Sequence, residues 1–197
     1  MEVVVGTPTI TPAYQATLLF IRENSDSKWG ATGGKYAGDR VIKLLLEHPE
    51  IQTILDYGCG EGTLKTWIED KGITDKKWTL YDPGTPKFKK APTGKFDLVI
   101  TTDVLEHVEE IMLNKVVDHL HKLTGKFLYS EIACYLSGRT FAGGHYIGQD
   151  FHINLKVPDM WVKRLQHREF TSVEYVPSIL EGWKVRCLFI QERIKDE

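Results

Sequence analysis

Three glycines alternate along one short stretch of the chain, at Gly58, Gly60 and Gly62, between an apolar run and a segment with helical spacing. Glycine lets the backbone turn sharply and leaves no Cβ to block a ligand that lies on the turn. The first N–H groups of the following helix point into the same space and favour a carboxylate or phosphate there. A strand–helix connection that needs glycine and binds nothing has the same pattern, so this stretch alone leaves both interpretations open.

An acidic residue follows at the end of the next apolar segment. Asp82 lies twenty residues after Gly62. A carboxylate at that place can accept hydrogen bonds from both hydroxyls of a ribose, which it does better than a neutral side chain. A lone acid at a strand end is usually a turn residue, but its pairing with the glycine turn favours a ligand that contains a ribose.

Three histidines are candidates for a catalytic base, because imidazole titrates near neutral pH. His107 begins a predicted helix, so it is equally suited to anchoring that helix. His145 and His152 lie in an irregular connection at 143–157, where a hydrogen-bonded loop histidine is the simpler interpretation of each. A metal site from His145, Asp150 and His152 uses good ligand types, but no regular ligand spacing supports it, and we predict no metal centre.

The elements that must position these residues alternate along the chain. Apolar runs predict strands at 53–57, 78–82, 96–103, 126–134, 170–176 and 184–191, with a seventh, very short strand near Phe88. Helical spacing predicts helices at about 12–23, 36–46, 62–71, 105–122 and 158–166. Residues 177–183 are too few for a helical crossover, so the last two strands must be antiparallel. The order predicts an α/β fold, with a Rossmann-like, doubly wound and mostly parallel seven-stranded sheet and an antiparallel C-terminal hairpin.

Ligands of such sheets bind beyond the carboxyl ends of the central strands. The glycine turn, Asp82 and the pair Thr102-Asp103 all lie at predicted strand ends. Residues 1–35 supply a predicted helix and a glycine-rich loop that contains Trp29. Because a tryptophan is rarely left in water, we expect this N-terminal segment to cover the site.

Three motifs together resemble the class I S-adenosylmethionine-dependent methyltransferases. The run LDYGCGEG at 55–62 is similar to the first motif of that family, and Tyr81-Asp82 to its ribose-binding motif. FDLV at 96–99, followed by DVLEHV at 103–108, is similar to a segment of many small-molecule methyltransferases. The resemblance covers residues 36 to 191 and implies S-adenosylmethionine as the cofactor.

The resemblance also implies how the cofactor would lie. Its methionine moiety would lie on Asp56 and the glycine turn, its ribose on Asp82, its adenine beside Pro83, and its amino group on the backbone at 101–104. The residues implied for cofactor binding are Asp56, Tyr57, Gly58, Cys59, Gly60, Asp82, Pro83, Thr102, Asp103 and Val104. The segment 87–94 offers no acid for the adenine amine, which departs from the family pattern.

The function predicted in this way is methyl transfer to a small-molecule or exposed acceptor by in-line displacement. The spacing His152…Pro158…Trp161 is also similar to small methyltransferases encoded by bacteriophages. A protein that binds S-adenosylmethionine without catalysis, and acts by contacting a partner, is the alternative. A nicotinamide-dependent dehydrogenase would have the longer G-x-G-x-x-G motif.

Composition limits which other classes of protein this chain can belong to. With 197 residues, the chain is long enough for one domain with a full core, and we predict a single domain over 1–197. A net charge of -2 makes sequence-independent nucleic-acid binding an unlikely function, and no apolar run is long enough to span a membrane. The three cysteines form no C-x-x-C pair, which predicts free thiols in a cytoplasmic protein. Nothing in the composition indicates an oligomeric state.

Overall fold

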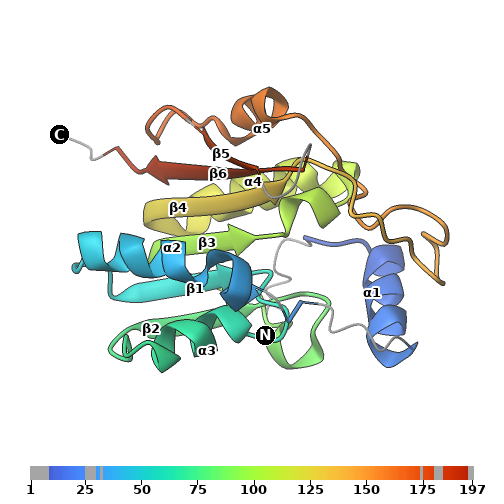
Figure 1. Cartoon of the computed structure of the whole chain (residues 1–197), viewed down its shortest axis with the longest axis horizontal. Coiled ribbons are helices and arrows are strands. Elements are labelled where there is room, and N and C mark those ends of the chain that lie inside the picture. The colour runs from blue at the N-terminus through green and yellow to red at the C-terminus, as the bar shows by residue number, and fades with distance from the viewer. Residues whose placement is uncertain (1–8, 25–29, 32, 174, 180–183, 195–197) are drawn as a thin grey trace, which may run out of the picture.

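A single six-stranded sheet carries helices on both of its faces (Figure 1). The computed structural model describes residues 9–24, 30–31, 33–173, 175–179 and 184–194, so Trp29 lies outside the described residues. The strands are β1 (Thr53–Tyr57), β2 (Lys77–Tyr81), β3 (Phe96–Thr102), β4 (Thr124–Ala133), β5 (Tyr175–Ile179) and β6 (Val185–Glu192). The helices are α1 (Pro12–Asn24), α2 (Gly33–Glu47), α3 (Thr63–Asp70), α4 (Glu110–Leu123) and α5 (Pro158–Leu165), with 3-10 turns η1 (Pro86–Phe88) and η2 (Leu105–His107).

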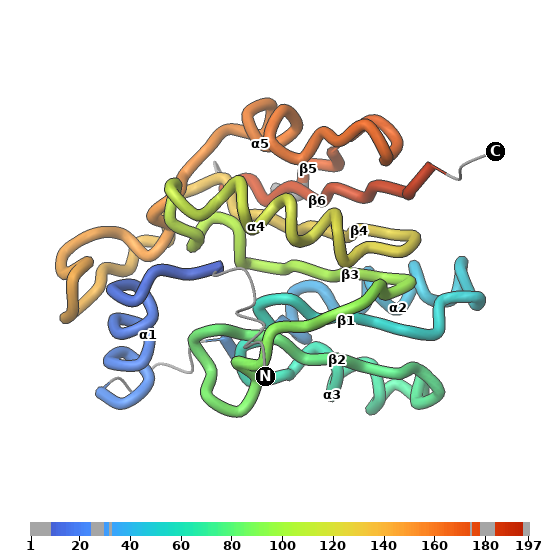
Figure 2. The backbone as a smooth tube through the Cα atoms, turned by 180° about the vertical axis from the view of Figure 1, so that it is seen from behind, coloured from blue at the N-terminus to red at the C-terminus, as the bar shows by residue number. Residues whose placement is uncertain are grey.

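The strand order is β2-β1-β3-β4-β6-β5. β1, β2, β3 and β4 pair in parallel, whereas β6 pairs antiparallel with both β4 and β5. Helices α2 and α3 cover the face seen in Figure 1, and α4 lies in front of the sheet in the reverse view of Figure 2. The Rossmann-like, mostly parallel sheet with its C-terminal hairpin is therefore confirmed.

The predicted number of strands is wrong, because the residues near Phe88 form no strand. Phe88 ends the turn η1, which begins at Pro86. The N–H of Asp82 donates to the carbonyl of Phe88 at 3.0 Å, and the N–H of Phe88 donates to the carbonyl of Thr85 at 2.9 Å. These bonds close a loop at the end of β2 and use backbone groups that a strand would offer to a neighbour, so β2 is the edge of the sheet.

The penultimate strand lies further along the chain than its predicted range of 170–176. Strand β5 contains Pro177, the first residue after the predicted range, although proline has no N–H to donate to a ladder. Proline is tolerated here because β5 is an edge strand. Phe170 instead makes an isolated antiparallel bridge with Arg193.

The helix predicted at 105–122 is divided in two. After η2 the backbone at Val108 is extended, with φ −78° and ψ 133°, and α4 begins only at Glu110. Asn154 occupies the break: its side-chain amide donates to the carbonyl of Val108 at 3.0 Å, and its N–H donates to the carbonyl of Glu106 at 2.9 Å. The break ties the segment after β3 to the long connection that follows β4.

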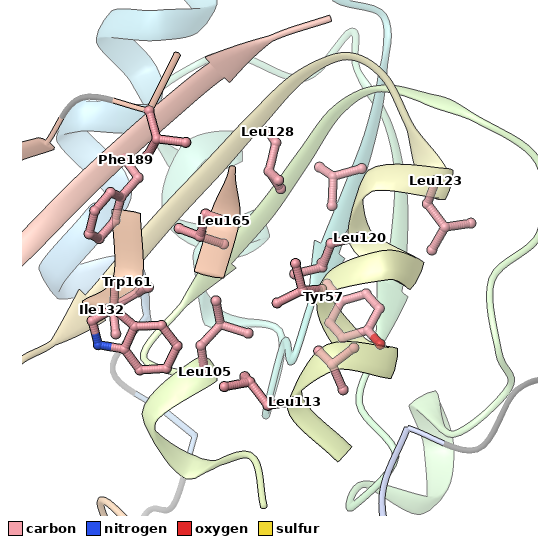
Figure 3. Close-up of a cluster of buried hydrophobic side chains, with 14 of the residues drawn as sticks. Tyr57, Leu105, Leu113, Leu120, Leu123, Leu128, Ile132, Trp161, Leu165 and Phe189 are labelled. Atoms are coloured by element: carbon pink, nitrogen blue, oxygen red, sulfur yellow. The ribbon is translucent and has the colours of Figure 1, made fainter. Parts of the chain in front are cut away.

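Two apolar cores hold the helices against the sheet. The core between the sheet, α4 and α5 includes Trp161 and Leu165 of α5, with Leu120 of α4 and Phe189 of β6 (Figure 3). The core under α2 and α3 includes Val41, Leu45, Leu64 and Ile68, which pack on Ile54 and Ile100 of the sheet. Each large apolar side chain buried in this way contributes roughly 1.5–3 kcal/mol relative to an exposed one.

Helix α1 lies beyond the carboxyl ends of the parallel strands in both views (Figures 1 and 2). Its apolar residues Tyr14, Leu18 and Ile21 form a third buried cluster with Phe141 and Phe151 of the connection after β4. The helix therefore packs mainly on a loop rather than on the sheet. Among the described residues, no helix combines the length and apolar character that a membrane span needs.

Candidate active site

The glycine turn between β1 and α3 is built from left-handed backbone conformations. Gly58, Gly60 and Gly62 have φ of 81°, 54° and 79°, which side chains rarely adopt. A Cβ on Gly58 would lie 2.3 Å from a methyl carbon of Val104, so this position also has no room for a side chain. The N–H of Gly58 donates to the carbonyl of Tyr81 at 2.7 Å, which joins the turn to the end of β2.

Asp82 is held against this turn by hydrogen bonds to both of its carboxylate oxygens. Oδ2 accepts from the N–H of Gly60 at 2.9 Å, and Oδ1 accepts from the N–H of Gly84 at 2.8 Å. The guanidinium of Arg22 lies 3.7 Å from Oδ2 and also binds Glu61 at 2.8 Å. Arg22 therefore ties α1 to the turn and to Asp82 at once.

All ten residues implied for cofactor binding line one cavity of about 670 Å³. They come from the ends of three strands and the turns that follow them, namely Asp56, Tyr57, Gly58, Cys59, Gly60, Asp82, Pro83, Thr102, Asp103 and Val104. A volume of this size is in the usual range for sites of small molecules and cofactors. Residues Thr9, Ile10, Tyr14 and Leu18 also line the cavity, so the N-terminal segment forms part of its wall.

Asp56 places a buried carboxyl group at the wall of the cavity. The residue is only 2% exposed, and its Oδ2 has no hydrogen-bond partner in the described part of the chain. Burial, together with the negative charge of Asp82, raises the pKa of Asp56 to about 7. A cation that entered the cavity would stabilise the ionised form of this group.

Asp103 also lines the cavity, at the end of β3, and its backbone is strained. Its φ is 52°, which is positive for no other non-glycine residue that the structure describes. Oδ2 accepts from Arg186 of β6 at 2.8 Å, and Arg186 lies 3.5 Å from Glu131 of β4. Arg40 of α2 also binds Glu131, and Tyr36 of the same helix lies against Arg186. A chain of alternating charges, in which Glu131 and Arg186 are buried, therefore fixes Asp103 at the end of β3.

Two of the three candidate histidines reach the cavity. His107 and His152 both line it, and their ring centroids are 4.9 Å apart. Burial, together with His152, lowers the pKa of His107 to about 4, so its imidazole is neutral at pH 7. His145 is not among the lining residues, and its N–H donates to Thr17 of α1 at 3.3 Å.

The metal-ligand set considered from the sequence is not assembled. Both carboxylate oxygens of Asp150 accept backbone N–H groups, from Ser137, Gly138 and His152. Within the described part of the chain, the potential metal ligands that do converge are Glu106, His107 and His152.

Several lining residues have no sequence pattern that would reveal them. Arg186 comes next to Asp103 only through the antiparallel register that opposes Ala133 and Arg186. Tyr36 lies under the Arg186 guanidinium, with 4.9 Å from its ring centroid to the guanidinium carbon. Arg22 binds Asp82 without lining the cavity, and it did have a chemical signal, since an arginine on a helix predicted to cover an acidic site is a natural partner for that acid.

The fold and the position of the cavity are those of a doubly wound α/β protein. Strand order reverses between β1 and β3, since β2 lies on one side of β1 and β4 follows β3 on the other. The cavity opens at the carboxyl ends of these strands, which is where doubly wound sheets bind nucleotide-like ligands. Sequence comparison narrows the class: a methyltransferase-domain family matches residues 30–176, and the chain belongs to this family.

Solved structures with the same fold include several methyltransferases. A 1,6-didemethyltoxoflavin-N1-methyltransferase from Burkholderia thailandensis, with its substrate and S-adenosylhomocysteine bound, is 16% identical with a TM-score of 0.61, over 97% of this chain and 94% of that chain. The magnesium protoporphyrin IX methyltransferase from Synechocystis PCC 6803, with S-adenosylmethionine bound, is 15% identical with a TM-score of 0.65, over 95% and 100%. A plantazolicin methyltransferase is 10% identical with a TM-score of 0.59, over 92% and 95%. No sequence among the curated proteins matches this chain.

Proposed function

We propose that the protein transfers a methyl group from S-adenosylmethionine to a small-molecule acceptor. Membership of the methyltransferase-domain family and the folds of the ligand-bound methyltransferases support this function. The observation that carries it is the cavity at the strand-order reversal, whose wall contains the glycine turn, Asp82 and the unpartnered carboxylate oxygen of Asp56. The sulfonium of the cofactor supplies an already activated methyl group, so the protein must mainly orient the reactants and exclude water.

The residues present fit this cofactor chemically. Each oxygen of Asp82 accepts one backbone N–H and retains a second lone pair for a ribose hydroxyl. Asp56 and Asp103 each have one buried carboxylate oxygen without a partner among the described residues, which suits a ligand that carries two positive charges. Pro83 borders the cavity next to Asp82, where the adenine would lie.

The acceptor would lie at the side of the cavity formed by η2 and the connection after β4. His107, Tyr135, Phe151 and His152 line this side. Aromatic walls with two imidazoles suit a small, partly apolar acceptor. The lowered pKa of His107 makes it a weak base, which leaves His152 as the candidate that takes a proton from the acceptor. His145 lies outside the lining residues, so we no longer favour it as the base.

Three further predictions stay proposals. We propose that residues 1–197 form one domain in which the N-terminal segment covers the cofactor, as the lining residues of α1 support. We also propose a cytoplasmic location, on the basis of the free thiols of all three cysteines. The resemblance to bacteriophage methyltransferases rests partly on Trp161. This side chain of α5 is completely buried in the apolar core, so packing alone explains a tryptophan at this position.

Replacing Asp82 with asparagine tests the proposed function. The wild-type protein is expected to bind S-adenosylmethionine with micromolar affinity, and Asp82→Asn to bind it about 10- to 100-fold more weakly, because charge-assisted hydrogen bonds to a ligand are worth roughly 1.5–3 kcal/mol. Titration calorimetry measures both affinities. Asp97→Asn is a matched control, since Asp97 lies at the other end of the sheet and accepts from the backbone of Thr53.

Two outcomes would count against this function. Absence of binding by the wild-type protein at millimolar S-adenosylmethionine would exclude the cofactor. Binding without any transfer of labelled methyl to small molecules of a cell extract would favour the alternative, a protein that binds the cofactor and acts without catalysis.

The raised pKa of Asp56 predicts a pH dependence of cofactor binding. The carboxyl is ionised above about pH 7 and protonated below it, so affinity for the cationic cofactor is expected to fall about tenfold from about pH 8 to about pH 6. The folding stability of the unliganded protein should change in the opposite direction and increase as the pH falls. Its folded state has the higher pKa, so the destabilisation from burying the charge is present above pH 7 and is lost as the pH falls.

Calorimetry and thermal melts across this pH range measure the two effects. Asp56→Asn should flatten both profiles, because the amide has the same shape and does not titrate. An affinity that is equally pH-dependent in wild type and Asp56→Asn would assign the effect to another group.

A further inference from the structure

Three potential metal ligands converge at the acceptor side of the cavity. Glu106, His107 and His152 each offer one ligand atom, and these atoms all lie within 4.8 Å of one another. Ligands of a zinc-sized ion lie about 2.0–2.2 Å from it, so ligands around one ion are about 3–4 Å apart. A spread of at most 4.8 Å is therefore close to the spacing that one ion requires.

Both imidazoles are oriented by backbone carbonyls. Nδ1 of His107 lies 2.7 Å from the carbonyl oxygen of Phe151, and Nδ1 of His152 binds the carbonyl oxygen of Tyr135. A carbonyl only accepts, so in each ring Nδ1 carries the proton and Nε2 does not. Histidines that bind metals are commonly held in this way, with one ring nitrogen donating to a carbonyl and the other facing the ion.

Glu106 completes the set with a carboxyl group that is fully buried. Glu106 is 0% exposed, and its Oε1 accepts from the N–H of Ala133 at 2.9 Å. Its Oε2 has no partner among the described residues. Carboxylates buried without a partner are costly, and a bound cation offsets that cost. The nearest cation in the network, Arg186, is bonded to Asp103 and Glu131 instead.

We propose that Glu106, His107 and His152 bind one divalent transition-metal ion at the acceptor side of the cavity. Two imidazoles and one carboxylate suit Zn²⁺, Co²⁺, Fe²⁺ or Mn²⁺ and leave coordination positions open. His107 and His152 line the same cavity as the proposed cofactor residues, so an open position faces the acceptor. The metal site itself does not depend on methyl transfer. The role of the ion described next, activation of the acceptor, rests on the proposed function.

Such an ion selects an acceptor that carries a hydroxyl group. The hydroxyl loses its proton to water when its oxygen binds the ion, because a bound dication lowers the pKa of that group. The oxygen lone pair then forms the bond to the methyl carbon, while the carbon–sulfur bond breaks and its electron pair stays on sulfur. The ion thereby replaces a general base, and both histidines serve as ligands.

Titration of the tag-free protein, residues 1–197, with Co²⁺ tests the site. We expect one Co²⁺ per chain, with visible absorption bands of a histidine-containing site. Proton spectra in water should show two strongly shifted exchangeable signals, one for each Nδ1–H that stays bonded to a carbonyl. This readout uses the wild-type protein and does not depend on activity.

Substitutions identify the ligands. Glu106→Gln, His107→Gln and His152→Gln should each weaken Co²⁺ binding at least about 100-fold, since loss even of a group that only orients a ligand costs 10- to 100-fold. His145→Gln should bind Co²⁺ like wild type, because His145 belongs to the same connection as His152 but not to the converging group. Thermal melts establish that each variant is folded.

Two results would overturn the site: no Co²⁺ binding by the wild-type protein at millimolar concentration, or binding that is unchanged in folded His152→Gln. Calorimetry with S-adenosylmethionine in the absence of metal separates the two proposals. Cofactor binding without Co²⁺ binding would defeat the metal site alone, and Co²⁺ binding without cofactor binding would defeat the proposed function alone.

Discussion

Replacing Gly60 with valine is expected to abolish binding of S-adenosylmethionine and to destabilise the glycine turn. A Cβ at this position would lie 2.3 Å from the carbonyl oxygen of Gly30 and 2.6 Å from its Cα. These are backbone atoms, so the contact cannot be relieved by rotating a side chain. The φ of 54° adds roughly 1–2 kcal/mol of strain for any L-residue. The turn must therefore move, and with it the N–H that holds Asp82.

Gly72→Val is a matched control for this experiment. Gly72 also has a positive φ, of 93°, but a Cβ there would meet nothing within 4 Å. The control variant should lose stability from backbone strain and keep its affinity for the cofactor. Calorimetry and thermal melts of both variants separate strain from collision. Wild-type affinity in Gly60→Val would show that the turn does not contact the cofactor.

Arg186→Met should be the most destabilising substitution of a charged residue in the described chain. Arg186 is 4% exposed and binds the carboxylates of Asp103 and Glu131. Its removal leaves buried negative charges without this cation, which typically costs about 3–5 kcal/mol. Denaturant unfolding measures the loss, and it should be accompanied by weaker cofactor binding as Asp103 leaves its left-handed conformation.

Arg164→Met provides the comparison at the surface. Arg164 binds Glu110 at 2.8 Å, but both side chains reach solvent. Exposed ion pairs contribute about 0–1 kcal/mol, so this variant should unfold almost like wild type. Similar stabilities of Arg186→Met and Arg164→Met would show that the buried chain of charges does not hold the end of β3.

The sequence predicted those parts of the site that depend on local patterns. The glycine turn and Asp82 are recognisable because the turn requires glycine and the acid follows the next strand at a regular spacing. Thr102 and Asp103 end a continuous apolar strand, and the ends of parallel strands must meet. The cavity that these residues share follows from chain order alone.

The rest of the site depends on contacts that chain order does not specify. Arg186 reaches Asp103 through the pairing of β4 with β6, and an arginine in an antiparallel strand has no distinctive pattern. His152 meets Glu106 and His107 because Asn154 ties its connection to the break after η2. The sequence offered only His145, Asp150 and His152 as a possible set of metal ligands, by residue type, and the lack of regular spacing led us to predict no metal centre.

The fold was mispredicted where proline has two possible roles. Pro86 precedes the short strand predicted near Phe88, but it begins a 3-10 turn. The strand predicted at 170–176 stops before Pro177, but Pro177 lies within a strand because that strand is at an edge. In both cases the outcome depends on whether a neighbouring strand needs the missing N–H, which is a property of the assembled sheet.

The attachment of α1 bears on the kinetics of the reaction cycle. One wall of the cavity is this helix, joined to the site by Arg22 through Asp82 and Glu61 and packed on a loop. Neither these contacts nor the hydrogen bond from the side-chain amide of Gln15 to the carbonyl of Pro83, at 2.8 Å, belong to the hydrogen-bond ladder of the sheet, so displacing α1 would break no strand pairing. A ribose that binds Asp82 competes with Arg22 for the same carboxylate. We therefore expect loading of fresh cofactor and departure of the spent one each to exchange contacts between α1 and Asp82, which makes this exchange a candidate for the slow step of turnover.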